Sequence, residues 1–407
     1  LSACGGATED AVDTTATDTA NRITISGSVG DGPIVGATVN VRNRHGAILA
    51  NTTSDPQANY SLNVDTQPDD FPLTLEASDG MDLVTGTSPD FILHSAVPDA
   101  QTLRANLNPH STAIIKTART MAGGLNRSNL EKARLNVVEK LNFGLDPDLV
   151  EDPITATLDS SNVTVVTYAS EALAEMLRRI SSTLGEEVFA NDVLDALAAD
   201  LTDGKLDGKG APGTNPRYTA VAHVISLQVL LESMLGELSV NGVSAQDAMN
   251  TAIDTIMGTT SDSANRPRSY KLNRLMFKQA KSALSAIRAI DPSVTLKDLM
   301  KVLTDLGEGA TTDEMAAALE QYSLDLSISS SLDSSIDQAA TATDDEIDSI
   351  NSAANSPDIL PDVNSAPAIS GTPASSVAEG EAYSFTPSAS DVDGDSLSFS
   401  VSCLLYT

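Results

Sequence analysis

The stretch "NPHST", Asn108 to Thr112, separates two different patterns in this chain. Before it, apolar and polar residues alternate, as in "RITISGSV" at 22–29 and "FPLTLEAS" at 71–78, which is the period of a strand with one buried face. After it, apolar residues recur every three or four positions, which is the period of an amphipathic helix. The change of period predicts a multidomain α+β protein, with strands first and helices second.

The first region, residues 22–107, is predicted to be a small β-sandwich. Short alternating runs are bounded by Gly, Pro, Asp or Asn, with "GATVNVRN" at 36–43 and "ANYSLNVD" at 58–65 between the two runs quoted above. The segment resembles the carboxypeptidase regulatory-like domain, a transthyretin-type sandwich, and this resemblance implies a spacer or interaction module without catalysis. The residues that carry the resemblance are Gly27, Gly36, Ala37, Val39, Tyr60 and Leu62.

The second region, residues 108–322, is predicted to be an all-α helical bundle. Ser128 with Glu131, and Thr311 with Glu314, have the spacing of capping boxes at helix starts. The opening "NPHST" and the phrase "DLTDGKLDGKG" resemble helical regions of bacterial surface lipoproteins, a resemblance that implies no activity. The expected helices cover 128–141, 168–180, 188–201, 218–238, 245–257, 272–290 and 311–322.

Residues 323–363 are rich in Ser, Asp and Ala, and prolines follow at 357 and 361. Such a segment buries little apolar surface, so we expect an acidic linker with a short helix near 344–350. No lysine or arginine follows Lys301, which makes the whole C-terminal part acidic.

Residues 364–407 contain "SASDVDGDSLSF", in which Asp391, Asp393 and Asp395 alternate before an apolar run. The segment resembles the first half of a dystroglycan-type cadherin-like or immunoglobulin-like domain, and the pattern breaks at "CLLYT". The resemblance implies calcium binding by these three aspartates, with Glu379 as a further ligand. The alternative is a solvated acidic turn, since carboxylates this close together require either water or a cation.

The N-terminal residues 1–21 resemble the end of a lipoprotein signal peptide followed by a flexible tether. Leu1 to Cys4 has the form of a lipobox, in which the cysteine becomes lipidated after cleavage. "GGATEDAVDTTATDTAN" at 5–21 is too polar to order itself. In such proteins an aspartate directly after the lipidated cysteine favours retention at the inner membrane, and here that position is Gly5. We therefore expect an outer-membrane or cell-surface location, with membrane attachment through Cys4.

A net charge of −32 argues against nucleic acid as a partner, because phosphate binding needs clustered Lys and Arg. The basic features are Arg178-Arg179 and a group at 266–281. The second group recurs at three- and four-residue intervals, which is more typical of the solvated face of a helix than of a site for acidic glycans or phosphates. A weaker calcium candidate is Asp200, Asp203 and Asp207, which lack the order of an EF-hand; a solvated turn between helices is the favoured alternative.

No motif for metal, phosphate or nucleophilic catalysis is present. His223 lies among apolar helix residues, where a core histidine is favoured over a ligand, and Ser111 beside His110 is expected to cap a helix. We therefore expect a lipid-anchored surface protein without enzyme activity, acting in adhesion or scaffolding with calcium as cofactor. The alternatives are a lipoprotein that binds polysaccharide or an envelope protein, and an enzyme housed in the bundle.

Overall fold

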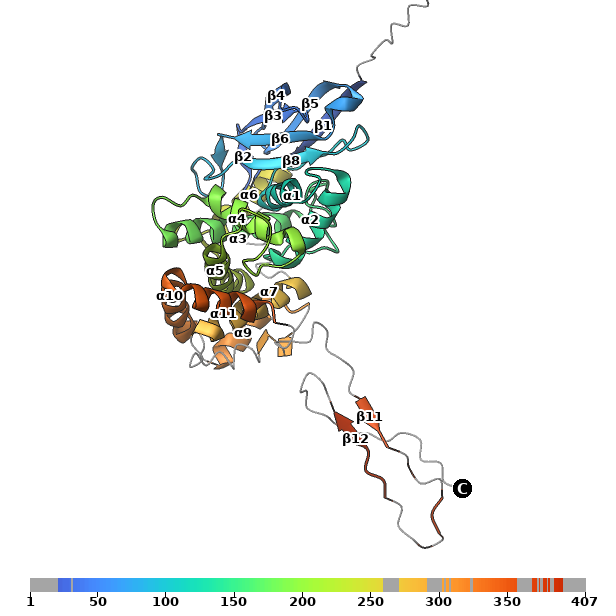
Figure 1. Ribbon diagram of the computed structural model, residues 1–407, viewed down its shortest axis with the longest axis vertical. Coiled ribbons are helices and arrows are strands. Elements are labelled where there is room, and N and C mark those ends of the chain that lie inside the picture. Colours follow the sequence, from blue (N-terminus) through green and yellow to red (C-terminus); the bar gives the residue numbers. More distant parts are fainter. Residues whose placement is uncertain are drawn as a thin grey trace, which may run out of the picture.

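The chain is described by a computed structural model, and Figure 1 shows its arrangement. The described residues are 21–30, 32–258, 271–290, 302–303, 305–306, 309–322, 325–356, 368–371, 373, 376–378, 380 and 384–390. Strands dominate up to residue 97 and helices dominate from residue 109 to residue 354, so the protein is of the mixed α+β class.

The strands form small antiparallel sheets at one end of the folded body, the upper end in Figure 1. One sheet has the order β4-β3-β6-β8, and β1 pairs with β5 in a second. All four predicted strand runs are confirmed, as β1, β3, β5 and β6. The strands are β1 (Asn21–Ser28), β2 (Ile34–Val35), β3 (Thr38–Arg42), β4 (Ile48–Thr53), β5 (Asn59–Thr66), β6 (Leu73–Ser78), β7 (Met81–Asp82) and β8 (Leu93–Val97).

The register of β5 against β1 follows the alternation in the sequence. Tyr60, Leu62, Val64 and Thr66 are buried and the residues between them are exposed. This is the pattern of a strand with one face on the core. The buried Tyr60 hydroxyl donates to the carbonyl of Ala105, outside the sheet, and burial raises the pKa of Tyr60.

Strand β8 was not predicted, because "LHSAV" does not alternate. All five of its residues are buried: β8 pairs with β6 along one edge, belongs to the hydrophobic core, and has α1 (Pro109–Thr120) packed against it. Two hydrogen bonds join the elements: Ser111 Oγ donates to the carbonyl of His94 at 2.8 Å, and the His94 amide donates to Thr112 Oγ1 at 2.9 Å.

The helices stack below the sheets around α5, which contacts α3, α4, α7, α9, α10 and α11. By length and composition α5 could cross a membrane, but most of it is buried inside the body, as in the core helix of a folded domain. The bounds are α2 (Arg127–Lys140), α3 (Val163–Leu184), α4 (Ala190–Asp200), α5 (Pro216–Leu235), α6 (Gln246–Met257), α7 (Arg274–Ile290), α9 (Thr312–Tyr322), α10 (Asp325–Thr341) and α11 (Asp344–Ala354). The shorter elements are two 3-10 turns, η1 (Pro68–Asp70) and η2 (Leu201–Asp203), and a hairpin of β9 (Ser239–Val240) with β10 (Val243–Ser244).

One hydrophobic core runs through the strands and the helices. Ile25 and Leu75 from the sheets belong to the same packed cluster as Leu173 of α3 and Leu230 of α5. The predicted boundary between residues 107 and 108 is therefore a change of secondary structure within a shared core.

The prediction of a linker over 323–363 is wrong over 325–341, which form a helix, whereas the short helix expected near 344–350 is confirmed. Residues 325–341 and 344–354 are the helices α10 and α11, and both pack on α5 and α7. Leu332, Ile336, Ile347 and Ile350 are buried there. Their spacing is helical, but the many Ser, Asp and Ala residues around them have the composition of a linker.

The capping predictions have different outcomes. At Thr311 the box is present: Thr311 N donates to Glu314 at 2.8 Å, and Glu314 N donates to Thr311 Oγ1 at 3.3 Å. The box predicted at Ser128 is wrong, because α2 begins at Arg127 and Asn126 is its cap, accepting from Asn129 N at 3.0 Å.

In the C-terminal region, β11 (Ala368–Ser370) pairs antiparallel with β12 (Ser388–Ser390). The cadherin-like or immunoglobulin-like fold of residues 364–407 stays a prediction.

Candidate functional site

The strand region and the helical region are joined by residues 103–108. This segment runs parallel to β1, with Ala105 N donating to the carbonyl of Ser26 at 2.9 Å and Leu107 N donating to that of Ser28 at 2.8 Å. The backbone N–H of Asn106 points away from β1 and donates to the carbonyl of Ile154 at 2.7 Å. The segment is thus bonded on both sides before it enters α1.

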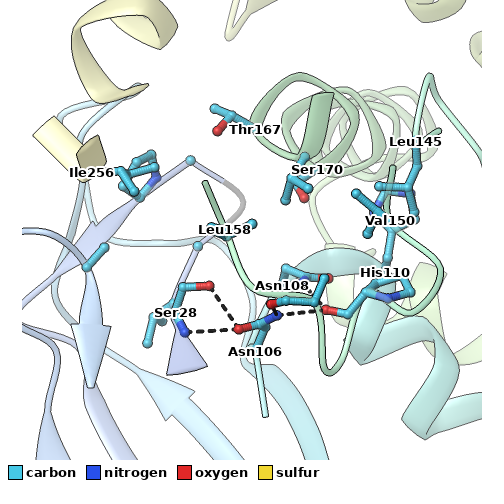
Figure 2. A pocket seen from close by; sticks show the side chains of 18 of the residues that line it. Ser28, Asn106, Asn108, His110, Leu145, Val150, Leu158, Thr167, Ser170 and Ile256 are labelled. Carbon is cyan, nitrogen blue, oxygen red and sulfur yellow. Dashed lines mark hydrogen bonds between the residues drawn. The ribbon is translucent and has the colours of Figure 1, made fainter. Parts of the chain in front are cut away.

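Asn106 and Asn108 hold this junction through their side chains (Figure 2). Asn106 Oδ1 accepts from the backbone and hydroxyl of Ser28, at 3.2 and 3.3 Å. Its Nδ2 donates to the carbonyls of Pro153 and Ala156, at 3.3 and 2.8 Å. Asn108 caps α1 by accepting from Ser111 N at 2.7 Å. Buried amides whose polar atoms are bonded in this way fix the approach of three segments.

A cavity of about 30 Å³ lies at this junction, between the end of β1, the 145–158 loops, α3 and Ile256 of α6 (Figure 2). Among the described residues that line it, none is Asp, Glu, Lys or Arg. Its volume is enough for one or two water molecules.

His110 lies in the wall of this cavity, with 1% of its surface exposed. Its Nε2 lies 3.0 Å from the carbonyl of Leu141 and 3.3 Å from that of Asn142. Because carbonyls only accept, Nε2 carries the proton and Nδ1 is left with a lone pair. Burial lowers the pKa of His110 to about 4, although both carbonyls favour the charged form. The imidazole is therefore neutral at pH 7.

Ser170 of α3 also lines the cavity and is 1% exposed. Neither its Oγ nor His110 Nδ1 has a hydrogen-bond partner. A serine nucleophile needs a base within hydrogen-bond reach, and these two atoms are not bonded to each other. The arrangement suits a small neutral group such as water, and it lacks the geometry of an activated nucleophile.

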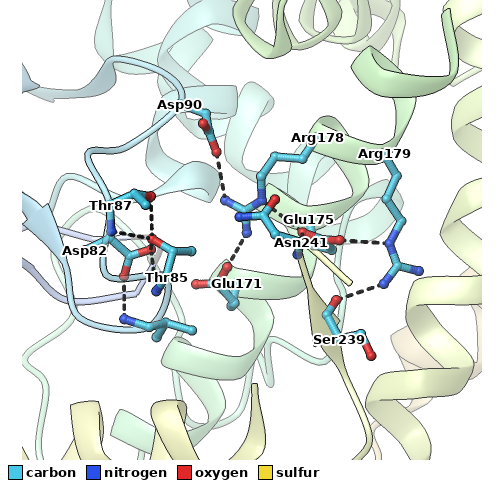
Figure 3. Close-up of polar contacts among 11 residues, drawn as sticks. Asp82, Thr85, Thr87, Asp90, Glu171, Glu175, Arg178, Arg179, Ser239 and Asn241 are labelled. Atoms are coloured by element: carbon cyan, nitrogen blue, oxygen red, sulfur yellow. Dashed lines mark hydrogen bonds and ion pairs between the residues drawn. The ribbon is translucent and has the colours of Figure 1, made fainter. Parts of the chain in front are cut away.

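A second polar cluster lies on α3, where Arg178 and Arg179 follow Glu171 and Glu175 (Figure 3). Arg178 pairs with Glu171, and its Nε lies 2.9 Å from Glu175. The side chains of all three are at most 8% exposed. These arginines, noted in the sequence only as a basic feature, therefore form buried ion pairs.

The cluster reaches three other parts of the fold, of which Figure 3 draws the loop that carries Asp90 and the hairpin that carries Ser239. Arg178 Nη1 lies 3.6 Å from Asp90, in the loop after β7. Arg179 makes two 2.7 Å bonds to Glu232 of α5 and donates to the carbonyl of Ser239 at 2.8 Å. Burial alone would lower the pKa of Arg179, but Glu232 and Glu175 outweigh it and raise the pKa. The cluster is a clamp between α3, α5, the β9–β10 hairpin and the strand region.

The other buried histidines are also neutral. His223 Nε2 lies 2.8 Å from the carbonyl of Leu206, and burial lowers its pKa to about 4. The prediction of a hydrogen-bonded core histidine is confirmed. Burial, with the nearby charges of Arg119 and Lys116, lowers the pKa of His94 to about 4 as well. The prediction for Ser111 is also confirmed, since it forms the capping box of α1 with Asn108.

Asp200 is the last residue of α4, and Asp203 and Asp207 lie in the turn that follows. Asp200 is buried and accepts from the amides of Gly208, Lys209 and Gly210 at 2.9, 3.0 and 3.1 Å. Burial raises the pKa of Asp200, although the hydrogen bonds from Gly208, Thr219 and Gly210 act to lower it. Asp203 Oδ1 and Asp207 Oδ1 each accept a hydrogen bond from the backbone N–H of the lysine two residues later in the chain. Asp200 thus folds the turn, and within the described part of the chain no group of three His, Cys, Asp or Glu is placed to hold a metal.

The main calcium candidates, Asp391, Asp393, Asp395 and Glu379, lie outside the described residues, and so does Cys4. Their predicted roles stay predictions.

Two features of these sites were not predicted from the sequence. Glu171, Glu175, Arg178 and Arg179 have the i, i+3 and i, i+4 spacing of ion pairs along a helix, a signal that could have indicated their pairing but not their burial. Asn106 and Asn108 gave no such signal, because their partners near residue 153 are distant in sequence.

Comparisons with known proteins found no match: no protein-family model, no curated protein and no solved structure matches the chain.

Proposed function

We propose that this chain is the spacer of a lipid-anchored cell-surface protein with an adhesive or scaffolding role. The observation that carries the proposal is the placement of the two ends of the folded body. Asn21, where β1 begins, belongs to the strand end, and α11 belongs to the opposite end, below α5 in Figure 1. The chain enters the folded body at one end and leaves it at the other. The body therefore separates the segment that precedes it from the segment that follows it.

The packing supports a stiff spacer. The sheets and helices share one hydrophobic core, and the Arg178 clamp joins the loop after β7 to α3. Elements that share a core and buried ion pairs do not swing about a hinge as separately packed domains do.

The finer fold assignments belong to the proposal. Residues 22–107 are taken as the carboxypeptidase regulatory-like sandwich, supported by the two sheets β1-β5 and β4-β3-β6-β8. Residues 108–322 are taken as the helical bundle and 364–407 as the start of a cadherin-like or immunoglobulin-like module.

Anchoring is assigned to Cys4, with the body on the cell surface beyond the outer membrane. Two acyl chains at this position would give stable attachment, since each buried methylene contributes about 0.8 kcal/mol. The test joins the charged and apolar regions of a signal peptide directly to Leu1, so that only the chain's own "LSAC" supplies the cleavage site. Mass spectrometry of the N-terminal peptide should show a diacylated Cys4 in the membrane fraction. The Cys4→Ser variant is the control, and an unmodified wild-type peptide would contradict the anchor.

Calcium is assigned to Asp391, Asp393 and Asp395, with Glu379, and it would stiffen the segment beyond the body. Calorimetric titration of residues 22–407 with calcium, and with magnesium as control, should give saturable binding that is lost when the three aspartates become asparagine. Binding that survives this change would move the site to Asp203 and Asp207, whereas no binding would leave a solvated turn.

The proposed role is not catalytic. Its support is that His110 and His223 both use Nε2 on backbone carbonyls, which commits them to structure. Binding of a polysaccharide or an envelope protein remains the alternative within the same class. A pull-down with envelope fractions, using the Cys4→Ser protein, would separate a specific partner from a spacer without one.

A further inference from the structure

Strand β1, through which the chain enters the folded body, is hydrogen-bonded along both of its edges. On one edge it pairs antiparallel with β5, from Asn21 opposite Thr66 to Ser28 opposite Asn59. On the other edge its second half lies beside the parallel segment 103–107. These three strands are here called the β1 layer. Over its second half, β1 can leave this layer only by breaking bonds on both sides.

The bonds between β1 and segment 103–107 form a continuous ladder. Among the described residues, four backbone hydrogen bonds of 2.8 to 3.0 Å join the two: Ser26 N to Leu103 O, Ala105 N to Ser26 O, Leu107 N to Ser28 O and Gly30 N to Leu107 O. Asn106 Oδ1 adds the two side-chain bonds to Ser28 described above. Gly27 permits this close approach, because a Cβ there would lie 2.3 Å from the carbonyl oxygen of Ala105.

Both strands of this ladder run lengthwise, from the strand end of the body toward the helices. The last residue of β1, Ser28, lines the cavity at the junction together with Ser170 of α3 (Figure 2). Its first residue, Asn21, lies about 23 Å away along an extended strand, at the upper end of the body in Figure 1. Segment 103–107 runs in the same direction and continues into α1 at Pro109.

Tension between the two ends of the body therefore acts on β1 along its own length. The chain that precedes Asn21 pulls β1 away from the helices, while α1 holds segment 103–107 in the opposite direction. Bonds between two parallel strands pulled in this way are loaded together, in shear, whereas bonds at the end of a strand pulled sideways are loaded one after another, in a peel. The lifetime of a fold under force is set by its rate of unfolding, so a barrier at which several bonds must break together prolongs that lifetime.

We propose that the β1 layer is a mechanical lock: it resists tension between the strand end and the helical end of the body, because β1 is loaded in shear against segment 103–107. The use of this resistance at a cell surface rests on the spacer function proposed above. The resistance itself does not depend on that function.

The test compares two directions of pulling on the same strand with optical tweezers. Both proteins are the full chain, expressed without a signal peptide, in which Cys403→Ser leaves Cys4 as the N-terminal attachment point. In the shear protein, Thr120→Cys supplies the second attachment point at the exposed end of α1. The force then acts between β1 and segment 103–107.

In the peel protein, Asp65→Cys supplies the second attachment point. Asp65 is exposed and lies opposite Arg22 in the register of β5 against β1, so the force separates the first residues of β1 from β5. The first rupture of the shear protein should require at least about twice the force of the first rupture of the peel protein, at the same loading rate. Equal forces in the two directions would overturn the proposal.

Two matched variants of the shear protein test the ladder itself, after circular dichroism has confirmed that each is folded. Asn106→Ala removes the two side-chain bonds to Ser28 and should shorten the lifetime at constant force about 10-fold. Asn142→Ala removes a buried amide of the helical region, which donates to the carbonyl of Leu145, and should leave that lifetime unchanged. An unchanged lifetime in Asn106→Ala, or equal shortening by both variants, would overturn the proposal.

Neither readout uses lipid or calcium, and the comparison of directions needs neither alanine variant. A Cys4 that is not acylated in the anchoring experiment would contradict the anchor and leave the lock intact. Equal rupture forces in the two directions would contradict the lock and leave the anchor intact.

Discussion

The buried His110 makes a sharp prediction about the response of this protein to acid. We consider His110→Gln, a change that keeps a side-chain N–H to donate to the carbonyls of Leu141 and Asn142 but removes the titratable Nδ1. Nδ1 is buried and faces no acceptor, so a proton bound there would be an uncompensated charge.

The magnitude follows from the pKa of His110, about 4 in the folded chain against an ordinary value of 6.5. Above pH 6.5 both states are neutral and the contribution to stability is fully present. As the pH falls below 6.5, the unfolded chain binds a proton that the folded chain refuses, so stability is lost until the pH approaches 4. Between pH 8 and pH 5 the loss amounts to about 2 kcal/mol, and complete titration gives about 3 kcal/mol.

The assay is urea unfolding followed by far-UV circular dichroism at pH 8 and at pH 5. The wild type should lose about 2 kcal/mol more than His110→Gln across this interval, because carboxylates and the other histidines titrate equally in both proteins. His45→Gln, at an exposed position, shows how much the loss of a surface imidazole alone contributes.

Equal losses in the wild type and in His110→Gln would refute the reasoning. That result would mean that His110 accepts a proton in the folded state, for example by exchanging its Nδ1 lone pair for a bond to Ser170 through water.

The remaining predictions concern stability measured by the same unfolding assay. Arg178→Met leaves buried carboxylates without their partner and should cost about 3–5 kcal/mol, whereas Arg42→Met, in a half-exposed pair, should cost no more than about 1 kcal/mol. Gly27→Ala places a Cβ 2.3 Å from the carbonyl oxygen of Ala105, so β1 must separate from that segment; we expect a loss of at least about 2 kcal/mol, and an unchanged midpoint would contradict this close approach. Thr311→Ala removes the cap of α9 and should cost about 1 kcal/mol, with Thr311→Ser retaining most of it.

Local patterns in the sequence predicted much of the fold. The alternation in "NYSLNVD" reappears as the buried and exposed sides of β5, and the spacing of Thr311 and Glu314 reappears as a capping box. His223 among apolar helix residues became a hydrogen-bonded core histidine. These features depend on residues only a few positions apart in the sequence, so they can be predicted without knowing which distant segments they contact.

Other features depended on partners that are far away in the sequence. β8 is buried along its whole length because α1 packs against it, and the few described aliphatic residues of α10 form a helix because they pack against α5, α7 and α3. The sequence likewise assigned no role to the two arginines of α3, since their Glu232 and Asp90 partners come from other elements.

The amino-acid sequence by itself therefore determined the change from strands to helices at "NPHST" and the residues that alternate into the core. Tertiary structure alone decided that both regions share one core, that Arg178 is buried among carboxylates, and that Nδ1 of His110 is buried without a hydrogen-bond partner. The physical reason is that hydrophobic periodicity is a property of neighbouring residues, whereas burial and pairing depend on which distant segments the fold brings together.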